Sequence, residues 1–368
     1  MSSVATSRPT QRKGSATAGR RLPILQHLLL QAFCLLIAFS VLFPILWIVS
    51  MSIDPRNIAR PTELNLFPPG ASFEAYLAVM DKPTANPVTF AQLALNSFKL
   101  AGGVSLLAVL IGISAAYAFS RFKFRGRQML MISVLAITVI PAVATIAPLF
   151  AMLNGVRVST TLINIIFIAF GSFMLIISGL IAWPNIRDRT YSLTILVLVA
   201  VGVLFGGYII SQGFTIDEGR PFNLRDSLLG VGIAMISGAL PFAIWNLKGY
   251  LDTIPKELEE AAIIDGASAN QIFFQVILPL TVPAIAVTGF LGFMGGWTEF
   301  FLSWQFLTQP EDFTLAMALW NMTGQYAGSV PWSRFAAMSI LVSLPVAIVY
   351  LALQRYIVGG LTLGGVKG

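Results

Sequence analysis

Cysteine and histidine are almost absent from this sequence, which holds one of each, Cys34 and His27. One cysteine cannot form a disulfide within the chain, and the two residues are too few for a Cys/His metal site. A Ser–His–Asp catalytic arrangement would have to use His27, which lies at the start of an apolar segment. The sequence also lacks a Gly-x-x-x-x-Gly-Lys-Ser/Thr loop, so any use of ATP would require another subunit to bind the nucleotide.

Charged residues are scarce as well, at 11% of the 368 residues, whereas soluble domains carry about 25%. Hydrophobic residues make up 56%, and the mean hydropathy is +0.81. Such a chain has too little charge to cover a surface that faces water, so we predict an integral membrane protein with many spans. No basic run is interleaved with the aromatic residues that bind single-stranded nucleic acid, so no nucleic-acid partner is expected.

Eight segments are long and apolar enough to cross a bilayer. Residues 1–21 are polar, basic and low in complexity, which predicts a disordered tail. The first span is too long for the apolar region of a signal peptide and no A-x-A site follows it, so we expect it to stay uncleaved. The eight predicted spans lie at roughly 22–51, 93–119, 128–152, 161–183, 191–213, 226–247, 280–305 and 334–354.

The basic residues indicate the orientation of the chain. With the N-terminus inside, the inside segments hold 15 of the 23 Lys and Arg residues, and the outside segments hold 8. This bias follows the positive-inside rule and predicts that the tails 1–21 and 355–368 are both cytoplasmic in a multi-pass protein of the cell membrane. The spans 161–183 and 191–213 are joined by the polar segment PNIRDRT, and an even number of spans is required there to preserve the sidedness downstream.

Two outside segments are unusually long. Residues 52–92 contain six prolines, and residues 306–333 are rich in aromatic side chains. Loops of this length without a function are uncommon, so the second loop is expected to be a docking surface for an external partner. The alternative is that Trp320, Tyr326 and Trp332 only anchor the loop at the membrane interface.

The segment 252–278 is charged, although membrane-length apolar segments flank it. Pro255 suits the first turn of a helix, and three glutamates follow near the positive helix end. Leu258, Ala261 and Ala262 form a smooth apolar stripe, and Gly266 then ends the helix. The pattern predicts a helix that offers a close-approach surface to another protein, and the alternative is a solvated loop.

A second helix follows the glycine. Ser268 and Gln271 match the S-x-x-Q capping box, and Pro279 and Pro283 mark the entry into the next span. The sequence therefore predicts a helix–turn–helix that lies along the cytoplasmic surface of the membrane.

The same residues carry a resemblance to a known family. Glu260-Ala261-Ala262, Gly266 and the run Val276-Ile277-Leu278-Pro279 resemble the E-A-A signature of permease subunits of binding-protein-dependent ABC importers, with Val in place of the usual Ile. AAYAFSRFKFRGR (115–127), DGASANQIFFQVILPLTVPAI (265–285) and LQRYIVGGLTLGGVKG (353–368) resemble the carbohydrate branch of that family, of the maltose type. The resemblance covers almost the whole chain except the tail before Arg20 and about 160–222.

The resemblance implies an all-α integral membrane fold, the type I ABC importer permease bundle with six core helices. This chain departs from that pattern, because TTLINIIFIAFGSFM begins like the fourth span and RDSLLGVGIAMISGAL begins it again. We therefore expect an inserted two-helix hairpin at about 160–222 within a permease domain at 93–354. The hairpin is expected to face lipid, and the alternative is a contact with an extra subunit.

The resemblance also implies the function. The chain would be a transport subunit and not an enzyme, without catalytic residues, cofactor or metal. It would form half of the path for a sugar, either a di- or oligosaccharide or a glycerol-phosphate-like compound. The implied partners are a second permease, a cytoplasmic ATPase dimer and an extracytoplasmic sugar-binding protein.

Site residues carried over from the family fall at both ends of the chain's spans. The ATPase would contact the coupling motif and the C-terminal tail, while Trp297 and Glu299 would line the outer end of the path, or Glu299 would bond to the partner permease. The family usually has Asn where this chain has Thr298, and the alternative for Glu299 is snorkelling at the membrane interface. The implied residues are Glu260, Ala261, Ala262, Asp265, Gly266 and Pro279 for coupling; Gly364, Gly365 and Lys367 in the tail; and Thr314, Leu315, Tyr326 and Trp332 for docking of the binding protein.

Two rival functions are weighed against this one. A secondary transporter or channel would favour several charges in a common cavity, whereas the spans hold essentially one, Glu299. A membrane-embedded transferase would need clustered acids, and the outer pairs Asp217-Glu218 and Glu311-Asp312 have no nearby His or Lys partner.

Gly292 and Gly296 also form a G-x-x-x-G pattern that permits close helix contact.

Overall fold

The computed structural model describes residues 24–57, 66–155, 157–158, 222–324 and 330–365, together with scattered residues between 161 and 211. The predicted tail 1–21, the docking residue Tyr326 and the tail residue Lys367 lie outside the described residues, as does most of the predicted insertion.

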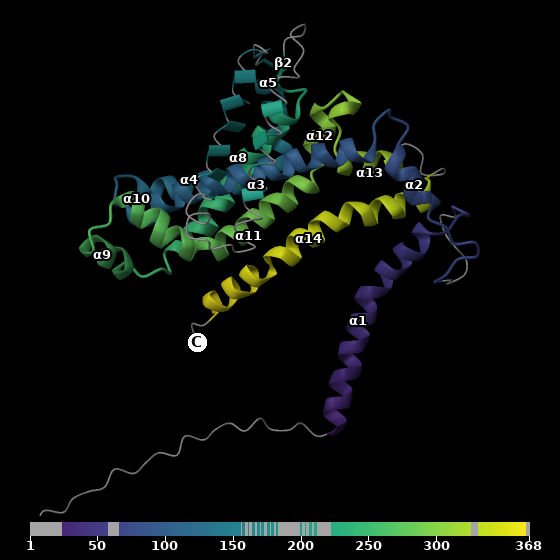
Figure 1. The fold of residues 1–368 in the computed structure, drawn as a ribbon, viewed down its shortest axis with the longest axis horizontal. Coiled ribbons are helices and arrows are strands. Elements are labelled where there is room, and N and C mark those ends of the chain that lie inside the picture. Colours follow the sequence, from purple (N-terminus) through teal and green to yellow (C-terminus); the bar gives the residue numbers. More distant parts are fainter. Residues whose placement is uncertain are drawn as a thin grey trace, which may run out of the picture.

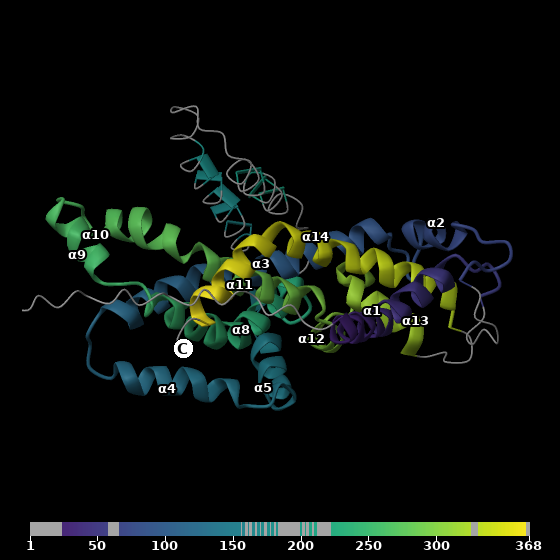
Figure 2. The ribbon, with the colours of Figure 1, turned by 90° about the horizontal axis from the view of Figure 1, so that it is seen from below.

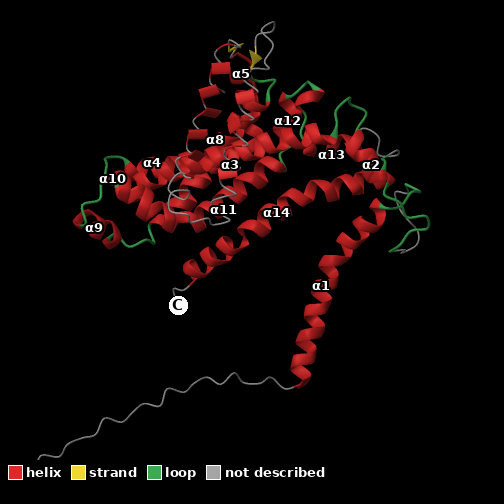
Figure 3. Ribbon diagram, viewed as in Figure 1, coloured by secondary structure: helices red, strands yellow, loops and turns green. Residues whose placement is uncertain are grey.

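The described chain is almost entirely helical, which confirms the predicted all-α class (Figures 1 and 3). Five of its helices are long and apolar enough to span a membrane, and a bent pair of helices would make six. The predicted count of eight is not tested, because spans 161–183 and 191–213 lie mostly outside the described residues. The five are α1 (Ile24–Ser52), α3 (Phe90–Arg121), α8 (Leu228–Leu251), the segment Ala269–Trp297 that ends in α11 (Leu278–Trp297), and α14 (Trp332–Gly365).

The expected span at 128–152 is broken in the structure, because α4 (Arg127–Thr138) and α5 (Ala142–Gly155) meet at an angle of 101°. Pro141 lies at the break; it has no N–H to donate and disfavours helix in the residue before it. The predicted span at 280–305 is also interrupted. The helix α11 ends at Trp297, and a short separate helix, α12 (Phe301–Phe306), follows.

The centre of the bundle is α3, which packs against α8 and α11, while α11 also packs against α14 (Figure 2). A Cβ atom added at Gly296 would lie 2.5 Å from the Cα of Ala101, and one at Gly292 would lie 3.1 Å from the Cα of Ser105. The G-x-x-x-G pattern therefore marks a real close contact between α11 and α3 of the same chain.

The short helices gather at the two ends of this bundle (Figure 1). At one end lie α9 (Glu257–Ile264), α10 (Ala269–Gln271) and a π-helical turn, η1 (Ile272–Ile277). We call it the coupling end. At the other, which we call the outer end, lie α2 (Glu74–Asp81), α12, a 3₁₀ turn, η2 (Pro310–Asp312), and α13 (Leu315–Gly324).

The first span stands apart from the bundle. Helix α1 packs on α14 near the outer end and diverges from it along the rest of its length (Figure 1). Nearly all of its apolar side chains are exposed. This long apolar helix is therefore left without a protein neighbour along most of its length within the described chain.

Two short strands bracket the predicted insertion. Strand β1 (Arg157–Val158) pairs antiparallel with β2 (Phe222–Asn223), so the chain returns to the place from which it left. Within the insertion, a Cβ atom added at Gly171 would lie 2.7 Å from the carbonyl oxygen of Gly206. The described parts of its two arms therefore pack closely against each other.

Candidate coupling site and outer face

The predicted turn of the coupling segment is present in the structure. Helix α9 ends at Ile264, and Gly266 adopts a left-handed conformation with φ of +80°. The N–H groups of Gly266 and Ala267 donate to carbonyls at the end of α9, those of Ile263 and Ala262, at 3.0 and 2.9 Å. A side chain at Gly266 would meet no atom within 4 Å, so only its backbone conformation restricts the residue type.

The second helix begins with the predicted capping box. The N–H of Ser268 donates to Oε1 of Gln271 at 2.8 Å, and the N–H of Gln271 donates to Oγ of Ser268 at 3.4 Å. The helix then widens into the π-helical turn η1 before α11. Pro279 follows this turn, is exposed, and has no N–H with which to continue the regular bonding pattern.

Most of the predicted coupling residues face outward. Glu260, Ala261, Asp265 and Gly266 are exposed, whereas Ala262 is half-buried against the hydrophobic cluster beneath α9. Leu258 of the predicted stripe is 44% exposed. Sequence reasoning missed the two most exposed apolar residues of this helix, Ile263 at 61% and Ile264 at 86%.

A polar network lies beneath α9 on its inner side. Arg121, in the last turn of α3, forms an ion pair with Glu259. Its guanidinium also donates to the carbonyl oxygen of Ile254 at 3.1 Å, and the Tyr117 hydroxyl donates to Glu259 at 3.4 Å. These contacts join α3 to α9, and sequence reasoning did not predict them because the partners are far apart in the chain.

The end of α8 is held in the same way. Oγ of Ser120 donates to Asp252 at 2.6 Å, and Lys248 forms an ion pair with the same carboxylate. Burial acts to raise the pKa of Asp252, but the hydrogen bonds from Lys248 and Ser120 and the charges of Lys248 and Arg127 outweigh it and lower the pKa below its ordinary value.

At the outer end, Glu299 caps a helix. Its carboxylate accepts hydrogen bonds from the N–H of Leu302 at 2.6 Å, the N–H of Ser303 at 3.1 Å and the Ser303 hydroxyl at 2.6 Å. These N–H groups belong to the first turn of α12 and have no partner within the helix. The local signal was available, because the carboxylate lies three and four residues before the groups that it binds.

Trp297 lies inside the bundle and not on an open surface. It is 1% exposed, and its indole N–H donates to the carbonyl oxygen of Val342 on α14 at 3.0 Å. Its ring centroid lies 5.5 Å from that of Phe293 and 4.7 Å from that of Phe98. Trp297 therefore joins α11 to α3 and α14.

The expected docking residues divide between buried and accessible positions. Thr314 and Leu315 are buried, at 1% and 0% exposure, and the N–H of Leu315 donates to Oγ of Ser97 at 2.8 Å. Both side chains face the bundle interior, and their assignment to docking stays a prediction. Trp332 is half-buried at the start of α14.

Asp312 lies in a charged cluster at the outer end. Burial raises its pKa, the Lys99 ammonium opposes this, and the charges of Asp226 and Glu311 raise the pKa further. The expectation that the Glu311-Asp312 pair has no Lys partner is wrong, because α3 brings Lys99 to it from a distant part of the sequence. Among the described residues, no three His, Cys, Asp or Glu side chains converge as metal ligands would.

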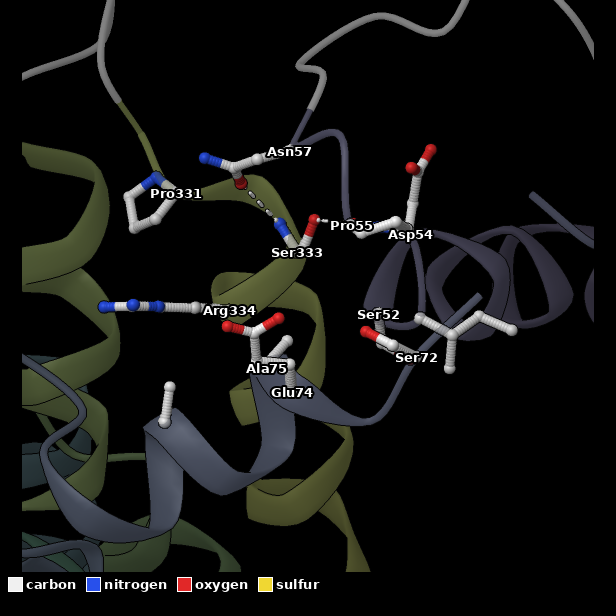
Figure 4. Close-up of a pocket in the computed structure, with 12 residues that line it drawn as sticks. Ser52, Asp54, Pro55, Asn57, Ser72, Glu74, Ala75, Pro331, Ser333 and Arg334 are labelled. Atoms are coloured by element: carbon white, nitrogen blue, oxygen red, sulfur yellow. Dashed lines mark hydrogen bonds between the residues drawn. The ribbon is translucent and has the colours of Figure 1, made fainter. Parts of the chain in front are cut away.

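A polar pocket of about 230 Å³ opens at the outer end, between the end of α1 and the starts of α2 and α14 (Figure 4). Ser333 ties these elements together, since its hydroxyl donates to the carbonyl of Asp54 and its N–H donates to Oδ1 of Asn57 at 3.0 Å. Glu74 and Arg334 line the same pocket with exposed side chains of opposite charge.

The tail residues Gly364 and Gly365 form the last turn of α14, which the structure describes by its backbone alone. The C-terminal end of α14 lies on the side of the bundle away from α2 (Figure 1).

The sequence matches the model of one protein family over residues 108–362, described as binding-protein-dependent transport system inner membrane component. The galactooligosaccharides transport system permease protein GanQ of Bacillus subtilis (strain 168) is 30% identical over 349 residues, covering 95% of this chain and 97% of its own. The maltose/maltodextrin transport system permease protein MalG of Vibrio vulnificus (strain YJ016) is 31% identical over 350 residues, covering 93% of this chain and 95% of its own. The trehalose transport system permease protein SugB of Mycobacterium tuberculosis (strain CDC 1551 / Oshkosh) is 27% identical over 333 residues, covering 90% and 95%.

Two solved structures share the fold. A bacterial ABC transporter involved in the import of the acidic polysaccharide alginate matches with a TM-score of 0.58 at 21% identity, over 90% of this chain and 96% of its own. A crystal structure of the bacterial alginate ABC transporter in complex with an alginate pentasaccharide-bound periplasmic protein matches with a TM-score of 0.56 at 15% identity. The match covers 90% of this chain and 94% of that chain.

Proposed function

The chain belongs to the family of binding-protein-dependent transport system inner membrane components, and we propose that it forms half of an import path for a sugar. As a member of this family it is a multi-pass inner membrane transport subunit and not an enzyme. The relatives named above transport galactooligosaccharides, maltose or maltodextrin, and trehalose. Their shared chemistry supports a di- or oligosaccharide as the substrate, with a glycerol-phosphate-like compound as the alternative.

The exposed surface of α9 carries this proposal. Ile263 and Ile264 project from a charged helix that lies at the coupling end, outside the long spans. Exposed apolar side chains in such a place mark a protein interface. We assign the surface formed by Glu260, Ala261 and these two isoleucines to a cytoplasmic ATPase dimer, with the end of α14 reaching toward the same partner.

The free side of α1 supports a second permease subunit. A helix with nearly every apolar side chain exposed, in contact with its own bundle only near one end, leaves room for another membrane protein beside it. We therefore propose a heterodimer in which α1 lies against the second permease.

The outer end supports the docking of an extracytoplasmic sugar-binding protein. Thr314 and Leu315 would act by holding α13 in place. The binding protein would contact Trp332, Tyr326 and the rim of the pocket in Figure 4. In this orientation both termini are cytoplasmic. The insertion is then a hairpin that crosses the membrane twice, which the pairing of β1 with β2 supports.

Co-purification tests the proposed function. The chain would carry an N-terminal tag, so that the tail stays free, and native membranes would be solubilised in mild detergent. We expect the wild type to retain an ATPase, a second permease and a sugar-binding protein. The variant Glu260→Ala/Gly266→Val should keep the second permease and lose the ATPase. A well-folded wild type that never retains an ATPase would overturn the proposal.

A further inference from the structure

We infer that Arg121 and Glu259 form a positioning pair that fixes the coupling helix α9 and passes its movement to α3. The inference rests on the proposed function, because α9 transmits movement only if an ATPase docks on it. Neither residue touches the transported molecule or nucleotide in this assignment. Their role is to connect a moving surface to the centre of the bundle.

The Arg121–Glu259 pair is largely shielded from solvent. The two side chains are 7% and 14% exposed, and each has further hydrogen bonds. Arg121 donates to the carbonyl of Ile254 at 3.1 Å and to the Ser120 hydroxyl at 3.2 Å, and Tyr117 donates to Glu259 at 3.4 Å. The pair thus contacts the last turn of α3, the start of the coupling segment and α9 itself.

A buried ion pair is weak evidence for stability, because apolar residues of the same volume would often serve as well. The guanidinium instead fixes the orientation of the groups that it binds, because its planar, always-charged group binds several acceptors in a fixed geometry. Arg121 uses this geometry to bind both ends of the segment from Ile254 to Glu259. One side chain of α3 therefore holds the coupling segment at two points.

Adjacent glutamates consequently take different roles. Successive side chains of a helix point about 100° apart, so Glu259 faces the bundle while Glu260 faces outward and is exposed. The inner glutamate holds the helix, and the outer one is left for the partner. A displacement of the outer surface of α9 is then transmitted to α3 through Glu259.

Helix α3 is positioned to transmit this displacement. Its Ser120 also binds Asp252 at the end of α8, so its last turn holds both sides of the coupling segment. Along its length α3 packs against α8 and α11, and it approaches α11 closely at Gly296. A displacement of its end is therefore carried into the packed spans.

The test measures sugar uptake per ATP hydrolysed in liposomes that hold the purified wild-type complex or a variant. The probe is whichever of maltose, trehalose and galactobiose the wild type takes up. We expect Glu259→Gln to keep the ATPase bound and to hydrolyse ATP, with uptake per ATP reduced roughly tenfold. Tyr117→Phe should reduce it about twofold. Glu257→Gln, an exposed residue of the same helix, is the matched control and should leave the ratio unchanged.

Reversing the charges separates positioning from simple folding. Arg121→Glu alone should uncouple uptake from hydrolysis, and the double variant R121E/E259R should recover part of the ratio. An unchanged ratio in Glu259→Gln would overturn the inference. So would a parallel fall of uptake, hydrolysis and amount of complex in Glu259→Gln and Tyr117→Phe, which would indicate only a structural role. Absence of an ATPase from the wild-type complex would instead overturn the proposed function.

Discussion

The coupling end and the outer end of the bundle differ in where they put the residues that the sequence singles out. At the coupling end, Glu260, Ala261 and Gly266 are exposed on a short helix–turn. At the outer end, Trp297 and Leu315 are buried among helices. A motif whose geometry is set by neighbours in sequence can be read from the sequence, whereas the exposure of a residue in a long loop depends on how that loop folds back.

The largest expected effect tests whether the residues singled out at the outer end belong to a packed core. Trp297→Ala should lower stability by about 3–5 kcal/mol, because it leaves a cavity between α3, α11 and α14. Trp297→Phe keeps most of the ring packing and loses the hydrogen bond to Val342, so it should cost about 1 kcal/mol. The measurement is the thermal midpoint of the purified protein in detergent.

The matched control for this prediction is Trp304→Ala, which removes the same residue type from a half-exposed position on α12. It should change the midpoint little. If Trp297→Ala left the midpoint unchanged and altered only transport, the difference between the two ends would disappear, and Trp297 would be a residue of the path.

The next effect tests the turn at the coupling end. Gly266→Val should retain membrane insertion and lose transport by at least about tenfold. A β-branched side chain is strained at φ of +80°, at a cost of roughly 1–2 kcal/mol or more. No neighbouring atom would clash, so the effect would come from the backbone of the turn alone. Transport of the sugar in proteoliposomes is the readout.

Gly126 offers the control, because it also has a positive φ, +84°, and also lies in open surroundings. It precedes α4 and is not part of the coupling segment. Gly126→Val should carry a similar backbone strain without loss of the ATPase from the complex. Full transport by Gly266→Val would show that the turn is not required for coupling.

These cases indicate how much the sequence could predict. The long spans α3, α8 and α14 were found because apolar length is a property of one segment. The turn at Gly266 and the capping box at Ser268 were found because their partners lie within a few residues.

Most of the missed features depend on a partner or an orientation that is set by residues far away in the sequence. Arg121 pairs with Glu259 across 138 residues, and the charge of Lys99 acts on Asp312 from another helix. The exposure of Ile264 follows from how α9 lies on the bundle, which its amphipathic pattern alone does not specify. The break at Pro141 is an exception, since a proline within a predicted span was a local signal that went unused.

A smaller effect separates capping from a role in the path for Glu299. Glu299→Ala removes the acceptor of the α12 N–H groups and should cost about 1 kcal/mol of stability. Glu299→Asp retains the charge with a shorter reach and should cost less than Glu299→Ala. Thermal midpoints and uptake are measured together. A loss of uptake in Glu299→Ala without any loss of stability would assign the carboxylate to the path and not to the helix.

The smallest effect compares two carboxylates, one at each end, whose pKa values shift in opposite directions from the ordinary value of 3.8. Hydrogen bonds from Lys248 and Ser120 outweigh burial and lower the pKa of Asp252, so its contribution to stability is present above about pH 4 and is lost as the pH falls below that value. Burial raises the pKa of Asp312, so its ionisation costs stability as the pH rises above about 4. At pH 7 Asp252→Asn should therefore destabilise the protein and Asp312→Asn should stabilise it, each by about 1 kcal/mol or less.

Thermal midpoints of these two variants and the wild type, measured from pH 3 to pH 7, give the check. Both differences from the wild type should shrink toward zero as the pH falls, because each wild-type carboxylate then becomes protonated in the folded and the unfolded state alike. The difference for Asp312→Asn should disappear at the higher pH, since a raised pKa is reached first. The same sign of effect for both variants at pH 7 would mean that the Lys99 charge outweighs burial at Asp312, and that the two ends hold their carboxylates by the same means.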